Sequence, residues 1–259
     1  MIKKSKYLEL LQERSVTPNF WCSDEYFRLA ALEELYADGW FSIVDPDAEV
    51  IVLPPIHEEK GFIPPTIMGP GERIWSDFPG YDPGHEFTKE LLDLEYTYAP
   101  QDFQKMVGAK WSVFRKNCRK FPERVKGLLK LEYVDAGPEH QSGILQLFNY
   151  WFAKQGEVQD SMAMTNFVFG GEHRKVLISE GKVWGLNVWD YNLSRINYRY
   201  CISYPDDFLN EYMRWLFYID GNREMLVNDG GVLDNPKLKA FKDKLNPISV
   251  REVYTWTRR

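Results

Sequence analysis

A strongly basic segment carries the clearest chemical signal in this sequence. Residues 105–130 contain nine Lys and Arg side chains and one acidic residue, Glu123, although the whole chain has a net charge of −6. Like charges four residues apart on a helix repel one another, so such a pattern favours an anion that offsets the repulsion. Arg and Lys both bind phosphate groups. The candidate phosphate-binding residues are Lys110, Arg115, Lys116, Arg119 and Lys120.

The basic segment is expected to form a helix over Lys110–Arg124 with one buried stripe. Apolar residues recur there at steps of three and four, at Trp111, Phe114, Cys118, Phe121 and Val125. Two interpretations of the charged flank remain open. It is either a solvated face neutralised by acidic loops, or the contact surface for tRNA, DNA, a nucleotide or a lipid headgroup.

Two further positions have residue types suited to catalysis. Asn228 and Asp229 directly follow a strand-like run at Glu224–Val227, and functional groups of α/β sheets often lie at the carboxyl ends of strands. Because Gly230 follows, a simple turn is an equal interpretation. Tyr254 lies on the final strand-like run, where it is either a proton donor to a leaving group or a core residue.

The elements that would position these residues crowd the last third of the chain. The expected strands are Lys182–Trp189, Arg195–Tyr204, Glu224–Val227 and Ile248–Thr257, and the expected helices are Asp206–Asp220 and Pro236–Leu245. Upstream, the expected elements are a strand at Leu129–Asp135 and helices at Pro100–Met106, Pro138–Lys154 and Met162–Val176. Alternating strands and helices predict a mixed α/β sheet with helices on both faces.

The first third of the chain is less regular. Its expected helices are 3–13, Asp24–Tyr36 and Glu86–Leu94, and its expected strands are Trp40–Val44, Val50–Leu53 and Glu95–Tyr98. Pro and Gly are dense in residues 54–84, which predicts a long structured loop, either covering a groove or only covering the domain. We place a boundary near residue 98, giving an N-terminal α/β region (1–98) and a second domain (99–259).

Composition describes an ordinary globular chain of 259 residues, 44% hydrophobic and 15% aromatic. No run approaches the ~20 apolar residues of a membrane span, and the N-terminus has no signal-peptide core. The three Cys residues are far apart, which predicts neither disulfides nor a zinc site, and favours a reducing, cytoplasmic location. The four His residues have no metal-ligand spacing, so no metal is expected; they are His57, His85, His140 and His173.

Two stretches resemble a known group of proteins. The run from Gly108 to Phe121 is similar to the Gly-x-Lys…Lys-Arg-Asn…Phe segment in the C-terminal domain of bacterial phosphatidylglycerol lysyltransferases and their soluble relatives. The tail from Asn228 to Tyr254 is similar to the tail of the same group. The order of elements likewise resembles an N-acetyltransferase (GNAT) core. The resemblance covers residues 95–259, and 1–94 only faintly.

The resemblance implies a GNAT-like mixed central sheet flanked by helices, with a degenerate GNAT-like half at the N-terminus. That fold splays two central strands apart to admit an acyl donor. The family is related to Fem-type transferases and uses aminoacyl-tRNA rather than acetyl-coenzyme A. It also implies that Lys242 faces a phosphate, although an exposed helix Lys is the alternative. No transmembrane half is present, which puts a lipid acceptor in question.

Coenzyme A itself is not expected. Acetyltransferases hold its pyrophosphate on a Gly-rich turn at a helix N-terminus, where backbone N–H groups meet the phosphates. The corresponding junction, 202–209, has no Gly and places Asp206 and Asp207 in the first helical turn. Two carboxylates there repel a pyrophosphate and instead suit a helix cap.

Three hypotheses follow. The first is an acyl- or aminoacyl-transferase with a phosphate-rich donor, possibly aminoacyl-tRNA, and an amine or hydroxyl acceptor. In it, Asn228, Asp229 and Tyr254 line the chemistry. The second is an acyltransferase whose acceptor is a modified DNA or RNA base. The third is a nucleic-acid-binding module that kept the fold without catalysis.

Overall fold

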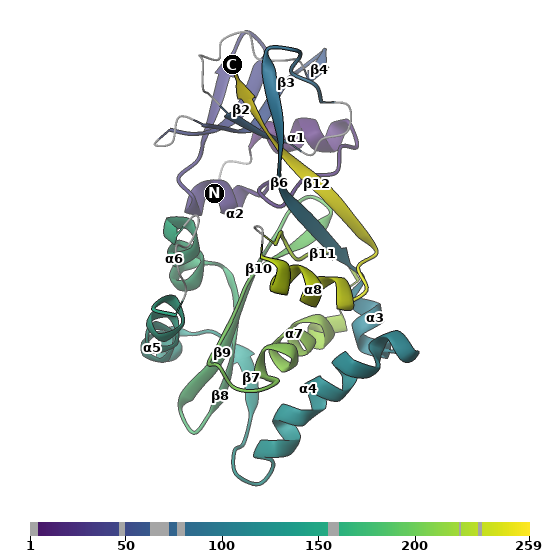
Figure 1. Cartoon of the computed structure of the whole chain (residues 1–259). Helices are drawn as coiled ribbons and strands as arrows, with labels where there is room; N and C mark the ends of the chain where they lie inside the picture. Colours follow the sequence, from purple (N-terminus) through teal and green to yellow (C-terminus); the bar gives the residue numbers. More distant parts are fainter. Residues whose placement is uncertain are drawn as a thin grey trace.

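A single mixed sheet runs through the whole molecule (Figure 1). The computed structural model describes residues 5–46, 50–62, 73–76, 81–154, 161–222, 224–232 and 235–259. Twelve strands lie within these ranges, in the order β1-β2-β3-β5-β12-β6-β11-β10-β9-β8-β7, with β4 paired to β3. The strands are β1 Glu33–Ala37, β2 Trp40–Asp45, β3 Val50–His57, β4 Gly61–Phe62, β5 Arg73–Ser76, β6 Phe87–Tyr98, β7 Glu132–Asp135, β8 His173–Ser179, β9 Lys182–Tyr191, β10 Arg195–Ser203, β11 Leu226–Asn228 and β12 Ser249–Arg258.

Helices cover both faces of the part of the sheet formed by β7–β11. Residues from α5 and α6 pack on one face of β9, and residues from α7 pack on the other, an arrangement visible in Figure 1. The mixed α/β sheet with helices on both faces is therefore confirmed. The helices are α1 Lys6–Glu13, α2 Asp24–Leu29, α3 Pro100–Lys105, α4 Ser112–Val125, α5 Gln141–Phe152, α6 Ser161–Gly170, α7 Leu209–Ile219 and α8 Pro236–Lys244, with 3₁₀ turns η1 Ala109–Trp111, η2 Pro138–His140 and η3 Asp220–Asn222.

Two long strands join the N-terminal and C-terminal parts of the sheet. Strand β6 pairs antiparallel with β12 from Phe87↔Arg258 to Thr97↔Ser249, and its C-terminal end also pairs with β11. Strand β12 in turn pairs with β5 on its far side. The boundary expected near residue 98 thus falls at the end of β6, where the chain leaves the shared strands.

Aromatic rings fill the core beneath α7. Tyr198 of β10 stacks on Phe217 with ring centroids 3.9 Å apart, and Phe103 of α3 stacks on Tyr218 at 3.7 Å. The predicted buried stripe of the basic helix is confirmed, because Phe114, its apolar neighbours on α4 and the preceding Trp111 are buried. This packing fixes α4 against α7. Within the described ranges, none of the helices has the length and apolar character needed to cross a bilayer.

Three predicted helices were wrong in part or entirely. The helix expected over Asp24–Tyr36 ends at Leu29, and its last residues, from Glu33, belong to β1 because they pair with β2. The helix expected over Glu86–Leu94 belongs to β6, where the ladder with β12 outweighs local preference. The helix expected over Met162–Val176 stops before Gly171, where a Cβ would lie 2.6 Å from a carbonyl oxygen, and β8 follows.

The loop predicted over residues 54–84 is also partly wrong. Strand β3 continues to His57, and β4 and β5 lie within the same stretch. Strand β4 pairs with β3, and β5 pairs with both β3 and β12, so hydrogen bonds between strands supply the order that Pro and Gly do not. The rest of the predicted loop, at 63–72 and 77–80, lies outside the described residues, as do its possible contacts with a groove.

Candidate functional site

The parallel strands β10 and β11 separate in the middle of the sheet. They pair over three residues only, Arg195↔Leu226, Ile196↔Val227 and Asn197↔Asn228. Beyond this point β10 continues to Ser203, hydrogen-bonded to β9. The segment that follows β11 instead leaves the sheet through Gly230, which has φ +62°. Among the described strands, none pairs with the final part of β10 on the β11 side. We refer to the opening between the carboxyl ends of β10 and β11 as the split.

A row of buried polar side chains crosses the sheet at the split. Asp190, Asn197, Asn228 and Thr97 are successive partners on β9, β10, β11 and β6, so they share one face. Glu95 lies two residues before Thr97 on the same face. None of the five is more than 2% exposed. A continuous polar row in place of an apolar core is unusual, because buried polar groups cost free energy unless they are paired. We call these five residues the polar row.

Glu95 is the acidic centre of the polar row. One carboxylate oxygen accepts the amide of Asn228 at 2.9 Å, and the other accepts the backbone N–H of Phe20 at 2.7 Å. Arg251 of β12 lies 3.8 Å away. Burial raises the pKa of Glu95 despite these partners. A carboxyl group with a raised pKa exchanges protons closer to neutral pH, which suits general acid–base chemistry.

Arg199 lies at a bulge in β10 beside the polar row. Its guanidinium donates to Asp190 at 2.8 Å and lies 4.2 Å from the ring centroid of Phe20. Nε and Nη1 of Arg199, Nδ2 of Asn197 and Oδ1 of Asp190 are buried and have no hydrogen-bond partner among the described residues. In proteins such groups are usually satisfied by ordered water or a ligand. The face therefore retains both donors and acceptors for a polar molecule.

Asp229 faces the other side of the sheet, towards α7 and α8. Its carboxylate forms an ion pair with Arg214 and lies 3.5 Å from Nζ of Lys242, and Tyr218 donates to it at 3.3 Å. Burial is the largest single influence and lowers the pKa of Arg214, but the combined attraction of Asp229 and of the neighbouring Tyr198, Cys201 and Tyr218 exceeds it, so the pKa is raised overall. Asp229 is 5% exposed. This carboxylate is therefore held between two cations, whereas its neighbour Asn228 belongs to the polar row.

Lys242 occupies a buried position rather than an open helix face. Its Nζ donates to the carbonyl oxygens of Asp229, Gly230 at 3.1 Å and Gly231 at 2.7 Å. Burial lowers the pKa of Lys242. In this arrangement the ammonium group holds the backbone turn that follows β11. Because Asn228 directly precedes this turn, its position is fixed as well.

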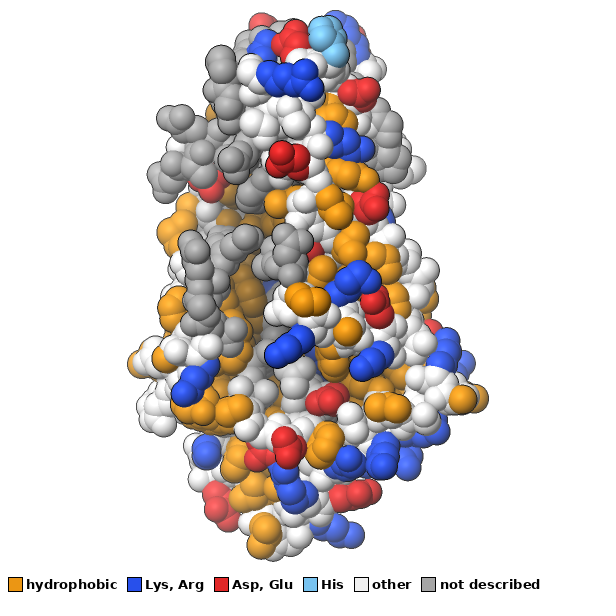
Figure 2. Space-filling view, viewed as in Figure 1, with side chains coloured by type: hydrophobic (Ala, Val, Ile, Leu, Met, Phe, Trp, Pro, Cys, Tyr) orange, Lys and Arg blue, Asp and Glu red, His pale blue; other side chains and the backbone are white. Residues whose placement is uncertain are grey.

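The cations of η1 and α4 lie on an open surface. Lys110, Lys116 and Arg119 are exposed, and Figure 2 shows Lys and Arg side chains gathered at the lower right, over α4. Arg115 is half-buried and donates to the carbonyl oxygen of Met106. Outside the masked ranges, none of these four forms an ion pair with a carboxylate. The basic helix is thus available to a ligand along most of its flank.

The C-terminal half of α4 reaches the turn between β10 and α7. Nζ of Lys120 lies 4.0 Å from the ring centroid of Phe208, and Arg124 forms an ion pair with Asp206. Phe208 adopts a left-handed conformation, φ +69°, immediately before α7. Because this turn begins at the open end of the split, α4 places positive charge beside that end. Arg124 also offsets one of the two acidic residues of the turn.

Tyr254 is not brought to the other predicted catalytic residues. On β12 it lies five residues beyond Ser249, which pairs with Thr97 of the polar row. That separation is roughly 17 Å along a strand. The Tyr254 hydroxyl donates to Glu252, a bond that raises its pKa, and Nζ of Lys89 lies 3.7 Å from the ring centroid.

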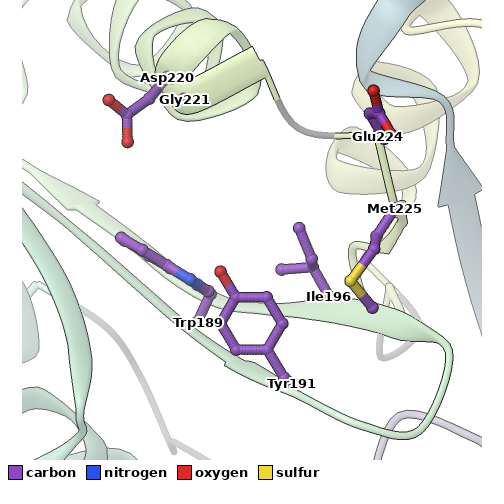
Figure 3. Close-up of a pocket in the computed structure, with 7 residues that line it drawn as sticks. All are labelled: Trp189, Tyr191, Ile196, Asp220, Gly221, Glu224 and Met225. Atoms are coloured by element: carbon purple, nitrogen blue, oxygen red, sulfur yellow. The ribbon is translucent and has the colours of Figure 1, made fainter.

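Two further groupings lie away from the split. A cavity of about 370 Å³ opens at the opposite, paired end of β10 and β11 (Figure 3). Separately, ligand atoms of Glu25, Glu172 and His173 all lie within 4.8 Å of one another, close enough to hold a metal ion. Arg28 lies 3.5 Å from Glu172 and already supplies positive charge there. The sequence spacing gave no sign of this grouping, because Glu25 comes from a distant helix.

These features define a fold class. The element order, with two central parallel strands that part next to a helix N-terminus, is a GNAT-like fold. No protein-family model and no curated protein matches the chain.

Solved structures with this fold match nearly the whole chain. A conserved protein of unknown function from Bacteroides thetaiotaomicron superimposes with a TM-score of 0.71 at 13% identity, covering 93% of this chain and 90% of that one. The C-terminal domain (DUF2156) of a putative lysylphosphatidylglycerol synthetase from Agrobacterium fabrum gives 0.65 at 11% identity, covering 97% and 91%. L-PGS from Bacillus licheniformis gives 0.64 at 14%, covering 100% and 92%. The resemblance inferred from the two sequence stretches is confirmed at the level of fold.

Sequence reasoning missed most of the polar row. Of its five residues only Asn228 was singled out, and neither Glu95 nor the neighbouring Arg199 was. The available signal was polar residues at inward positions of otherwise apolar strands, as at Asp190 and Asn197. Their common location depends on strand order, which places β6 beside β11 although the two are more than a hundred residues apart in sequence.

Proposed function

We propose that this protein is an acyl- or aminoacyl-transferase that takes its acyl group from a phosphate-bearing donor and passes it to an amine or hydroxyl. Aminoacyl-tRNA is the proposed donor. In the reaction, the acceptor nitrogen or oxygen bonds to the acyl carbon and loses a proton. The ester bond to the donor breaks, and the donor's hydroxyl group regains a proton.

The observation that carries the proposal is the split beside a basic helix. An acyl chain laid along the final part of β10 would meet, on the β11 side, a strand edge that no described strand pairs with, flanked by the polar row. The donor's phosphates would contact η1 and α4 through Lys110, Arg115, Lys116, Arg119 and Lys120. One of the structures similar in fold is named as the C-terminal domain of a putative lysylphosphatidylglycerol synthetase, which supports transfer of an aminoacyl group.

We further propose that the reaction takes place at the carboxyl end of β11. Asn228 would contact the substrate there, and Glu95, with its raised pKa, would accept the acceptor's proton. Asp229 and Lys242 would keep the turn in place. Acetyl-coenzyme A is not the donor we propose, because the β10–α7 turn lacks the glycines that a pyrophosphate needs.

Salt-dependent binding tests the donor site. Affinity for tRNA and for duplex DNA is measured over a salt series, because the slope of log affinity against log salt reports the phosphates neutralised. The double variant Lys116→Glu with Arg119→Glu, at two exposed positions, should make this negative slope shallower by about 1.5 to 2 units. Lys60→Glu with Lys154→Glu, the same charge change at other exposed positions, should leave it unchanged. Equal slopes in both double variants would overturn the donor site.

Turnover separates an enzyme from a binding module. Charged tRNA carrying labelled aminoacyl groups is incubated with the protein and a pool of amines, and transfer of label is followed. Glu95→Gln should reduce transfer by about 10²-fold, the usual contribution of a general base. Tight tRNA binding without any transfer would favour the non-catalytic module. Preference for DNA over tRNA would favour a nucleic-acid acceptor.

A further inference from the structure

The cavity at the paired end of β10 and β11 is separate from the split and from the polar row. Its floor is formed by Trp189 and Tyr191 of β9 and Ile196 of β10, and Figure 3 shows the Tyr191 hydroxyl directed into the open space. Met225, just before β11, forms one wall. The aromatic core, including the stacked Tyr198 and Phe217, lies between this cavity and Asp229. A molecule bound here would not occupy the proposed acyl-transfer site.

The floor is aromatic and well supported. Trp189 is 5% exposed and packs on Phe217, with ring centroids 5.5 Å apart. His173, the partner of Trp189 on β8, lies beside both rings, stacked on Trp189 at 5.9 Å and edge-on to Tyr191 at 4.8 Å. Because three elements hold these rings, the floor is preformed. Faces of Trp and Tyr attract cations, and a Met thioether adds polarizable apolar contact.

Acidic groups stand around the mouth. Asp220 and Glu224 lie on opposite sides of the opening in Figure 3. Lys175 lies 3.0 Å from Asp220 and 3.7 Å from Asp135, so one cation is shared between two carboxylates. Glu224 is exposed and forms no ion pair with another residue in the described ranges. Among the described residues around the mouth, acidic side chains therefore outnumber basic ones, above an apolar floor.

We propose that this cavity binds a small organic cation, a primary ammonium group attached to an apolar or aromatic body. The apolar body lies against Trp189, Ile196 and Met225, and the ammonium group lies between Tyr191 and Glu224. The volume of about 370 Å³ is within the range of small-molecule sites. An anion is disfavoured by the acids, and a neutral analogue gains nothing from them.

A matched pair of probes tests the charge requirement. Binding of 2-phenylethylamine and of 2-phenylethanol is measured by calorimetry on the full chain. The two share one aromatic body and differ in the charged group. The amine should bind at least fivefold more tightly, because only it gains the ion pair and the cation–π contact. Equal affinity of the two probes, or no binding of the amine, would overturn the proposal.

Variants at the mouth of the cavity test whether the ammonium group binds there. Glu224→Gln should weaken amine binding about fivefold and leave the alcohol unaffected. Met225→Lys, at a position 36% exposed, puts a positive charge in the wall and should weaken amine binding at least tenfold. Glu90→Gln, the same change at an exposed position of β6, should have no effect. Amine affinity unchanged in both mouth variants would place the ligand elsewhere and overturn the assignment, whatever the outcome of the transfer assay.

Discussion

At the scale of single residues, buried polar contacts give Asn228 and Asp229 different roles. The turn after β11 has a sequence, Asn-Asp-Gly-Gly, that suggests catalysis, yet its two polar residues face opposite sides of the sheet. Asn228 bonds Glu95 in the polar row, and Asp229 lies between Arg214 and Lys242. A buried ion pair contributes little net stability, but removing one partner leaves the other charge uncompensated. Replacing Asp229 is therefore expected to lower the free energy of unfolding by a different amount than replacing Asn228.

Asp229→Asn should destabilise the fold by about 3 kcal/mol. The substitution keeps the shape of the side chain but leaves Arg214 and Lys242 without their buried counter-charge. Urea unfolding measures the loss. Asp207→Asn, an exposed carboxylate in the β10–α7 turn, is the control and should change stability little. Unfolding of the Asp229 variant at the wild-type midpoint would show that the cations do not depend on this carboxylate.

At the scale of elements, short contacts fix helices to strand ends. Helix α2 is fixed to the start of β8 by Glu25, whose carboxylate accepts the backbone N–H of Glu172 at 2.7 Å. Burial, opposed by that hydrogen bond, raises the pKa of Glu25 from 4.5 to about 7. The carboxyl group is thus more readily protonated in the folded state than in the unfolded chain. The α2–β8 contact consequently makes stability depend on pH.

The sign of that dependence can be checked. A raised folded pKa gives a contribution that is complete below the unfolded value of 4.5 and is lost as pH rises through about 7. Partial solvent exposure reduces it to about 1 kcal/mol. Denaturant unfolding followed from acid to mildly alkaline pH should show this loss in the wild type. Glu25→Gln should remove it, and Glu33→Gln, at an exposed position on β1, should keep it. Parallel pH profiles for all three proteins would contradict the assignment.

At the scale of the whole molecule, the N-terminal and C-terminal parts are joined because a strand from the first part lies within the sheet of the second. Strand β6 comes from the first hundred residues but lies between β11 and β12. It supplies Glu95 and Thr97 to the polar row and Tyr96 and Tyr98 to the core beneath α8. The segment around Phe20 also covers the polar row. The C-terminal part therefore receives both core residues and members of the polar row from the N-terminal part.

A fragment of residues 99–259 should fail to fold cooperatively, because β11 and β12 would lose the strand between them. Circular dichroism during thermal unfolding, with amide dispersion in an NMR spectrum, measures this. The fragment 81–259 restores β6 and is the matched control, expected to regain more structure. A sharp transition in the shorter fragment, equal to that of the longer one, would show that β6 is dispensable.

Local sequence patterns determined much of the C-terminal half. Periodic apolar residues specify the basic helix and its buried stripe, and the strand–helix order from β9 to β12 defines a mixed sheet. These features depend on neighbours within a few residues, which a sequence displays directly. The concentration of positive charge on α4 is of the same kind, because Lys116 and Arg119 remain exposed once the apolar stripe is buried.

Only the tertiary structure decided which residues meet. Glu86–Leu94 has a helical pattern but forms part of β6, because hydrogen bonding to β12 gains more free energy than an isolated helix turn. Glu95 and Asn228 meet only through that strand pairing, and Lys242 turns inward because three carbonyl oxygens accept its ammonium protons. Contacts of this kind join residues more than ten positions apart, and their energy depends on burial that no local pattern encodes.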